Sequence, residues 1–228
     1  MSDGGTVIGE DGRARCPWGL STPDYVAYHD EEWGRPVHGE DALFERICLE
    51  AFQSGLSWIT ILRRRETFRA AFDHFKIDAV AAFTDQDRTR LLADPGIIRN
   101  RAKVDAAIAN AAAAQALRDG YEGGLDAFIW SFAPDPVTRP APRTGADVPA
   151  TTPESLALAK DLKKRGFRFV GPTTAYALMQ ACGLVDDHLA GCFARAGGGA
   201  ADAGADAWAD PGAETATEAG RAGKASGG

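Results

Sequence analysis

Apolar residues recur at helical spacing along most of the chain. In residues 41–52 they follow one another at intervals of three and four, and Gly55 stands just after the run. This periodicity predicts an amphipathic helix, whereas alternation at every second residue predicts a strand and is nearly absent here. The sequence therefore predicts an all-α fold.

Other segments predict helices in the same way. Residues 58–72 continue the helical pattern, and residues 97–117 form an Ala-rich stretch of high helix propensity. Thr151 and Glu154 have the spacing of a capping box, which marks the start of a helix that we expect to end at Gly166. Together these elements are sufficient for one helical domain.

Composition divides the chain into one domain and two tails. Residues 196–228 are almost entirely Gly, Ala, Thr and scattered acids, which cannot bury a core and predict a disordered acidic tail. We also expect residues 1–12 to form a disordered N-terminal tail. The domain then spans residues 13–195, with the Pro-, Thr- and Arg-rich residues 133–150 as a long surface loop.

The net charge of −7 is unusual for a protein that binds nucleic acid. Residues 1–12 carry three acids and no base, and residues 196–228 contribute −3, which leaves −1 for the predicted domain. A near-neutral domain can still carry a basic face, and the local face governs phosphate binding. The charge therefore leaves a DNA-binding function open.

Four cysteines without an N-terminal secretory signal argue against a disulfide scaffold. Cys48 and Cys182 lie in apolar helical patterns and are interpreted as core residues. No apolar run reaches the roughly 20 residues that span a bilayer, so we expect no membrane association. These features favour a cytoplasmic protein.

Two cysteines and two histidines have the composition of a structural zinc site. Cys16 and His29 lie near the start of the predicted domain, and His188 and Cys192 close it at a spacing of four residues. On a helix or helical turn, that spacing places both side chains on one face. Two thiolates and two imidazoles make a saturated tetrahedral set. Spacing alone also allows a stray thiol and ordinary polar histidines.

A basic helix, a tight link and a second helix follow one another in residues 162–178. The first helix is expected to end at Gly166, and the second begins at Pro172. This order resembles a helix-hairpin-helix, whose backbone N–H groups meet DNA phosphates. The candidate DNA-binding residues are Lys164, Arg165, Gly166, Arg168 and Gly171. A solvated helix face followed by an ordinary turn is the alternative.

Several aromatic residues and one carboxylate gather in the first quarter of the chain. The aromatic residues are Trp18, Tyr25, Tyr28, Trp33 and Trp58. Glu50 lies in an apolar helical stretch, near the border of the face that we expect to be buried. Burying a carboxylate is costly unless something pairs with it. By periodicity alone, a Glu that reaches solvent or a nearby Arg is the favoured interpretation.

Ordered sequence blocks resemble the 3-methyladenine DNA glycosylase I family. The longest are CPW at 16–18, YHDEEWG at 28–34, QSGLSW at 53–58, GIIRNR at 96–101, KRGFRFVG at 164–171 and MQACGLV at 179–185. Shorter matches include CLE at 48–50, WSF at 130–132 and DH at 187–188. The resemblance runs from about residue 13 to residue 193 with near-constant spacing. Ala51 departs from it, because many members have Gly there.

This resemblance implies a fold and an activity. The fold is that of the helix-hairpin-helix DNA glycosylases, with a zinc site that joins the N- and C-terminal segments. The activity is hydrolysis of the N-glycosidic bond of 3-methyladenine in alkylated double-stranded DNA, after the nucleotide has been flipped out of the helix. One flipped base needs no second subunit, so we expect a monomer.

The resemblance also implies residue roles. Glu50 and Tyr28 would be the catalytic residues that face the excised base, with Trp58 stacking on it and Trp18 at the pocket wall. The family positions of the structural Zn²⁺ ligands are matched by Cys16, His29, His188 and Cys192.

Other interpretations share much of this sequence pattern. A glycosylase for another damaged base would have the same scaffold, and a non-catalytic, zinc-stapled DNA-binding module would have the same hairpin. Asp187 lies where many superfamily members place a catalytic Asp, but this family is known for lacking that residue. Because Asp187 adjoins His188, we expect it to orient that zinc ligand or a local turn.

Overall fold

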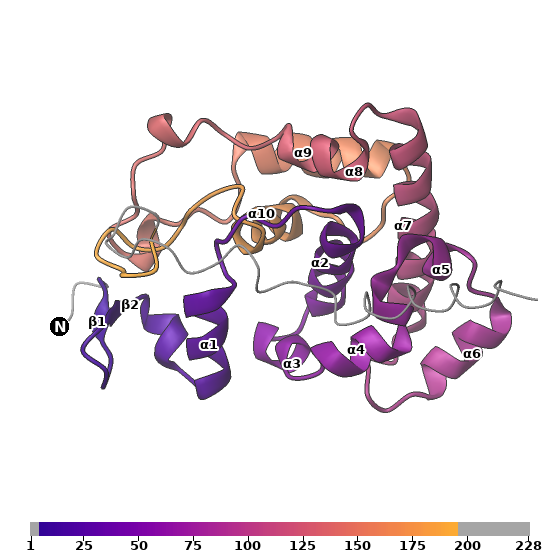
Figure 1. The fold of residues 1–228 in the computed structure, drawn as a ribbon, viewed down its shortest axis with the longest axis horizontal. Coiled ribbons are helices and arrows are strands. Elements are labelled where there is room, and N and C mark those ends of the chain that lie inside the picture. Colours follow the sequence, from indigo (N-terminus) through magenta and orange to yellow (C-terminus); the bar gives the residue numbers. More distant parts are fainter. Residues whose placement is uncertain (1–4, 196–228) are drawn as a thin grey trace, which may run out of the picture. The chain divides into compact units, whose positions relative to one another are not determined.

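The computed structural model describes residues 5–195, whose regular structure is almost entirely helical (Figure 1). The α-helices are α1 (Pro23–Glu31), α2 (Glu40–Gln53), α3 (Trp58–Leu62), α4 (Arg65–Ala71), α5 (Ile77–Ala81), α6 (Asp85–Ala93), α7 (Arg101–Gly120), α8 (Gly124–Trp130), α9 (Pro153–Lys164) and α10 (Pro172–Ala181). Short 3₁₀ turns occupy Pro17–Leu20, Asp73–Phe75, Pro136–Thr138 and Gly145–Asp147. The predicted all-α character is confirmed, with one two-stranded sheet added. The tail predicted at residues 196–228 lies outside the described residues.

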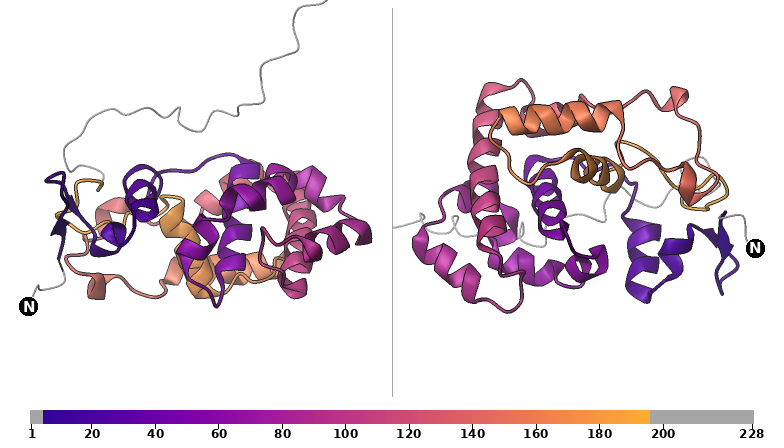
Figure 2. Two further views of the ribbon diagram at one scale, coloured as in Figure 1. Left: turned by 90° about the horizontal axis from the view of Figure 1, so that it is seen from below. Right: turned by 180° about the vertical axis from the view of Figure 1, so that it is seen from behind.

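Helix α2 is the central element of the core. It contacts α7, α8 and α10, and it lies between α10 and α7 in Figure 1 and in the right-hand view of Figure 2. Acidic Glu40 and Asp41 in its first turn suit the positive end of the helix dipole. All residues from 43 to 52 are buried, the polar ones included. Those polar side chains must therefore find partners inside the protein or stay unpaired.

The single helix predicted over residues 58–72 is two helices, α3 and α4. The break lies at Arg64, which leaves the helical conformation with φ −104° and ψ 3°. The turn directs Phe68 and Phe72 against Phe52, with ring centroids 4.7 and 5.7 Å apart. Packing against α2 thus overrides a continuous local pattern.

Two helix starts differ from the prediction by a few residues. Helix α7 begins at residue 101 because the Asn100 side chain accepts a hydrogen bond (3.2 Å) from a backbone N–H of its first turn. In α9 the capping box joins Thr152 and Ser155 instead of Thr151 and Glu154. Adjacent threonines offer two candidate caps, and the backbone conformation of the folded chain selects one.

Residues 5–12 are ordered, which corrects the prediction of a disordered tail there. Strand β1 (Val7–Ile8) pairs antiparallel with β2 (Ala14–Arg15). Arg15 is only 3% exposed and donates hydrogen bonds to Asp11 across this hairpin. Composition could not predict this hairpin, because an isolated Asp11 is expected to be solvated. Only the fold places the buried guanidinium of Arg15 beside it.

The two ends of the domain meet. The backbone N–H of Phe193 donates to the carbonyl of Ala14 (2.9 Å), so the C-terminal segment lies on the N-terminal hairpin (Figure 1). The loop at residues 133–150 joins them, because the carbonyl of Pro142 accepts a hydrogen bond from Ala190 N–H (2.7 Å). No helix within residues 5–195 is long and apolar enough to cross a membrane.

Candidate active site

An open pocket is lined by aromatic rings and a few polar side chains. Its lining residues are Trp18, Tyr25, Tyr28, Trp33, Glu50, Gln53, Trp58, Ala177 and Gln180. They come from the 3₁₀ turn after β2, from α1 and the turn that follows it, and from α2, α3 and α10. The four residues predicted to meet the base (Glu50, Tyr28, Trp58 and Trp18) are all among them.

The aromatic side chains form a continuous wall. The rings of Tyr28 and Trp58 have centroids 5.5 Å apart with planes tilted by 44°. Trp18 meets Tyr25 and Trp33 edge to face, at 5.6 and 5.0 Å. Such a wall can enclose a flat heteroaromatic ring, and the negative faces of its rings favour a cation.

Glu50 is the buried carboxyl group of this pocket. It projects from the buried part of α2, is 5% exposed, and makes no hydrogen bond or ion pair within residues 5–195. Burial therefore raises its pKa to about 8, and the nearby charge of Arg46 opposes the rise. The interpretation of Glu50 as a border residue that reaches solvent is wrong, because the other elements close over α2 on that side as well.

Arg46 is a pocket neighbour that the sequence interpretation missed. It lies one helical turn before Glu50 on α2 and is 4% exposed. Its guanidinium contacts Glu32 (3.3 Å), and Arg65 binds the same carboxylate with two nitrogens. The spacing of four residues between Arg46 and Glu50 was the available sequence signal. This chain of charges brings a permanent positive charge close to the buried carboxylate.

Tyr28 supplies a neutral hydroxyl to the pocket. The residue is 4% exposed, and burial raises the pKa of its phenol above the usual range, while Arg46 acts in the opposite direction. The hydroxyl therefore keeps its proton at any physiological pH and can donate a hydrogen bond.

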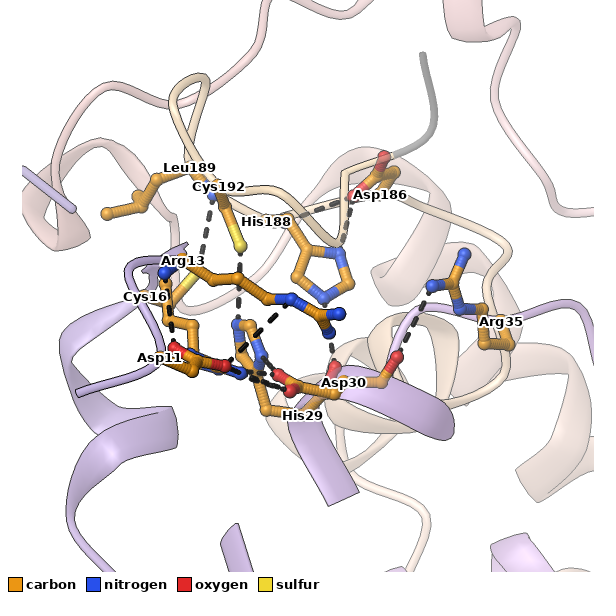
Figure 3. A network of polar contacts seen from close by, with 11 residues as sticks. Asp11, Arg13, Cys16, His29, Asp30, Arg35, Asp186, His188, Leu189 and Cys192 are labelled. Atoms are coloured by element: carbon orange, nitrogen blue, oxygen red, sulfur yellow. Dashed lines mark hydrogen bonds and ion pairs between the residues drawn. The ribbon is translucent and has the colours of Figure 1, made fainter. Parts of the chain in front are cut away.

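Cys16, His29 and Cys192 form a compact cluster (Figure 3), and the His29 ring contacts Trp18 of the aromatic wall. One ligand atom of each lies within 4.8 Å of those of the others, and all three residues are buried. The Nε2 of His29 is 3.5 Å from the Cys192 sulfur, and its Nδ1 is held by Asp30 at 2.8 Å. The pKa of the Cys192 thiol is lowered by the neighbouring Cys16 thiol and by His29.

His188 lies beside this cluster without joining the compact group of three. Its ring centroid is 4.9 Å from that of His29, and its Nε2 is 3.4 Å from the His29 carbonyl oxygen. Its Nδ1 contacts Asp186 at 2.9 Å, so Nε2 faces the interior (Figure 3). The structure thus brings together three of the four predicted ligands and places the fourth next to them.

The aromatic wall and the cluster are in direct contact. The ring centroids of Trp18 and His29 are 5.1 Å apart, and those of Trp33 and His188 are 4.7 Å apart. Gly34 has φ +76°, and a Cβ there would lie 2.7 Å from the His188 ring. Glycine is therefore required at that position both for its backbone conformation and for the close approach of the imidazole.

The comparisons with known proteins agree with this geometry. The sequence model of the methyladenine glycosylases matches residues 18–195. The chain belongs to this family. It is 49% identical to DNA-3-methyladenine glycosylase 1 of Escherichia coli (strain K12) over 178 residues, which are 78% of this chain and 95% of that protein.

Solved structures of family members have the same fold. A crystal structure of 3-methyladenine DNA glycosylase I matches with a TM-score of 0.74 and 48% identity, over 80% of this chain and 100% of that one. A variant of 3-methyladenine DNA glycosylase I in complex with 3-methyladenine matches with a TM-score of 0.74 and 34% identity, over 80% of this chain and 97% of that one. The resemblance seen in the sequence is confirmed.

In this methyladenine glycosylase, Asp187 does not orient His188, which corrects the sequence interpretation. Its carboxylate accepts hydrogen bonds from Tyr176, from Gln180 (2.9 Å) and from Arg139 (2.7 Å). The neighbouring Asp186 holds His188 instead. Adjacent residues in a turn point in different directions, and sequence adjacency could not decide which one reaches the imidazole. Through Gln180, Asp187 supports one side of the pocket.

The predicted hairpin is present between α9 and α10. Gly166 ends the first helix with φ +94°, and Gly171 precedes the first turn of the second. Lys164, Arg165 and Arg168 are exposed, and the guanidinium of Arg165 also lies over the ring of Phe128 at 4.7 Å. The hairpin therefore presents its basic side chains to solvent, and one of them also contacts the domain.

Proposed function

We propose that this chain is a DNA-3-methyladenine glycosylase that hydrolyses the N-glycosidic bond of 3-methyladenine in alkylated DNA. The observation that carries the proposal is the buried Glu50 carboxyl, without a hydrogen bond in the described residues, inside a pocket of aromatic rings. A protein that only binds phosphates gains nothing from such a group. The named activity of the E. coli relative and the 3-methyladenine complex of another support the same conclusion.

Recognition of the lesion follows from its charge. Methylation at N3 makes the base cationic while it is still attached to deoxyribose. Flipping it out of the duplex costs on the order of a few kcal/mol, and this cost is offset when the flipped ring enters the aromatic pocket. Trp58 and Trp18 provide ring faces that attract a cation more strongly than a neutral adenine.

Glu50 and Tyr28 complete the recognition. The cationic base favours the ionised form of Glu50 and lowers its pKa from about 8. The carboxylate then accepts hydrogen bonds from the exocyclic amine of the adenine, and the neutral Tyr28 hydroxyl donates to an acceptor of the base. An unmethylated adenine gains less from this site, because it brings no charge to offset the burial of the carboxylate.

The bond cleavage needs little acid catalysis. The bond between C1′ of the sugar and N9 of the base breaks, and its electron pair neutralises the positive charge of the leaving 3-methyladenine. Water forms the new bond to C1′ and releases a proton to solvent. Asp187 is not assigned as the base in this step, because Arg139 and Tyr176 already occupy its carboxylate.

The cluster of Cys16, His29 and Cys192, with His188 beside it, fits a structural zinc ion. Two thiols and two imidazoles are the donors that Zn²⁺ prefers in closed tetrahedral sites. Asp30 and Asp186 hold the outer nitrogens of the two histidines, as carboxylates often do around zinc. The role of such an ion is to join the two ends of the domain behind the pocket wall.

The DNA partner is proposed to lie along the hairpin between α9 and α10. Exposed Lys164 and Arg168 suit phosphate contacts, together with the backbone around Gly166 and Gly171. The contribution of Arg165 is expected to be smaller, since its guanidinium lies over an aromatic ring of the domain. The monomeric state and the cytoplasmic location expected from the sequence stay predictions.

Release of free bases from methylated duplex DNA tests this function. The purified protein should release 3-methyladenine with multiple turnovers, resolved by chromatography from 7-methyladenine, 7-methylguanine and 3-methylguanine. Glu50→Gln keeps the size of the side chain, removes its charge and should lower the rate at least about 100-fold. Binding of alkylated DNA without base release would show a non-catalytic module, and selective release of another base would show a different glycosylase.

A further inference from the structure

Phe169 is an exposed aromatic residue in the link between α9 and α10. It is 40% exposed, although its neighbours Phe167 and Val170 are buried at 3% each. Its backbone has φ +56°, in the left-handed region that side chains with a Cβ disfavour. The fold therefore keeps a large apolar ring in solvent and in an unfavourable backbone conformation, which is a combination found at functional sites.

The backbone next to this ring is held by a dedicated contact. Asn110 lies on the Ala-rich helix α7 and is completely buried. Its Oδ1 accepts a hydrogen bond from the backbone N–H of Arg168 (2.7 Å), and its Nδ2 donates to the carbonyl of the same residue (3.1 Å). A buried amide is costly unless it is paired, and here both of its polar atoms fix the residue before Phe169.

The surroundings of the ring are basic. Between residues 160 and 168 the chain has five exposed bases against one acid, Asp161; the bases are Lys160, Lys163, Lys164, Arg165 and Arg168. A polyanion with apolar surface between its charges matches this arrangement. The DNA backbone has that chemistry, since apolar deoxyribose carbons alternate with phosphates.

We propose that Phe169 is a DNA-contacting residue whose ring packs on a deoxyribose between phosphates bound by the exposed bases. Asn110 is the positioning residue that fixes the hairpin so that the ring stays outside the domain core. This assignment rests on the proposed DNA-binding function and adds a non-ionic contact to it.

The salt dependence of DNA binding separates this contact from the ionic ones. Phe169→Asn removes the ring, and Asn tolerates the left-handed conformation better than Phe does. Binding to a duplex with a stable abasic-site analogue, measured by fluorescence anisotropy, should weaken about tenfold at every salt concentration. The slope of log K against log salt should not change, because no phosphate contact is lost. Arg168→Gln should instead reduce the magnitude of that slope by about one.

Two variants serve as controls. Leu156→Asn removes another exposed apolar side chain, 52% exposed on α9, and should bind DNA as the wild type does. Phe169→Tyr keeps the ring and should restore affinity. The Tm of Phe169→Asn should be no lower than that of the wild type, since backbone strain is relieved.

Three results would overturn the inference. Wild-type affinity in Phe169→Asn, from a protein that releases 3-methyladenine, would remove the ring contact and leave the proposed function intact. A loss of affinity that tracks a lower Tm would assign Phe169 to folding alone. A wild-type protein that neither binds duplex DNA nor releases the base would overturn both the inference and the proposed function.

Discussion

The Cys/His cluster and the pocket carboxyl Glu50 are neighbouring buried polar groups that differ in their hydrogen-bond partners. In the cluster of Cys16, His29 and Cys192 a thiol lies next to His29, and Asp30 and Asp186 hold the outer nitrogens of His29 and of the adjacent His188. In the pocket, Glu50 makes no hydrogen bond within residues 5–195, and its pKa rises to about 8. The aromatic side chains of Trp18 and Trp33 separate the two regions and contact both.

This difference indicates what each region is for. A satisfied polar cluster stabilises the fold, whereas a buried carboxyl group without a hydrogen bond destabilises it until a partner binds. For Glu50 the proposed partner is the cationic base, so part of the binding free energy of the substrate relieves a strain that the free protein carries. We therefore expect substitutions in the cluster to act mainly on stability and substitutions in the pocket to act mainly on substrate binding.

Breaking the satisfied cluster should have the largest effect on stability. Cys16→Ser is expected to lose bound zinc and to lower Tm by about 10 °C, because a structural metal contributes directly to the free energy of folding. Metal content by mass spectrometry and thermal unfolding measure the two effects. Cys48→Ser makes the same change at a buried cysteine outside the cluster, and this variant protein should still contain zinc. An unchanged metal content and Tm in Cys16→Ser would contradict the proposed site.

Replacing the Glu50 carboxyl group should instead increase the stability of the protein. The folded-state pKa of Glu50 is raised to about 8 from 4.5, so between these values the folded state holds a proton that the unfolded state has released. Stability is therefore lost as pH rises through this window, by at most about 1.4 kcal/mol per pH unit. Glu50→Gln should be more stable than the wild type at pH 8, and the advantage should shrink towards pH 5.

Urea unfolding at several pH values measures this difference. Subtracting the free energy of unfolding of the wild type from that of Glu50→Gln isolates the contribution of one group from all others that titrate. A difference that does not change with pH, or a Gln variant less stable at pH 8, would mean that Glu50 is paired in solution.

The smallest change is expected from a variant at the contact between the Cys/His cluster and the pocket. Gly34→Ala brings a Cβ within 2.7 Å of the His188 ring at a backbone φ of +76°, and should lower Tm by a few degrees and base release about tenfold. Gly39→Ala is the matched control, since Gly39 has φ +92° and no atom within 4 Å of its added Cβ. Equal loss of base release in both variants would mean that backbone strain alone acts, without coupling between cluster and pocket.

Much of the fold and of the site could be predicted from local sequence. Helical periodicity gave the all-α character and the hairpin, and the ordered blocks gave the family, because both signals lie in contiguous stretches of chain. The predictions failed where a side-chain contact depends on the folded backbone, even between residues that are close in the sequence. Asp11 finds Arg15 only in the folded hairpin, and Asp186 takes the place expected for Asp187.

The sequence by itself therefore determined which side chains this protein has for its chemistry and which helices carry them. Only the tertiary structure decided how those side chains are solvated: Glu50 is enclosed with Arg46 one turn away, and Asn110 reaches across to Arg168. The physical reason is that periodicity depends on neighbours along the chain, whereas burial and pairing depend on the elements that the fold packs on every side of a residue.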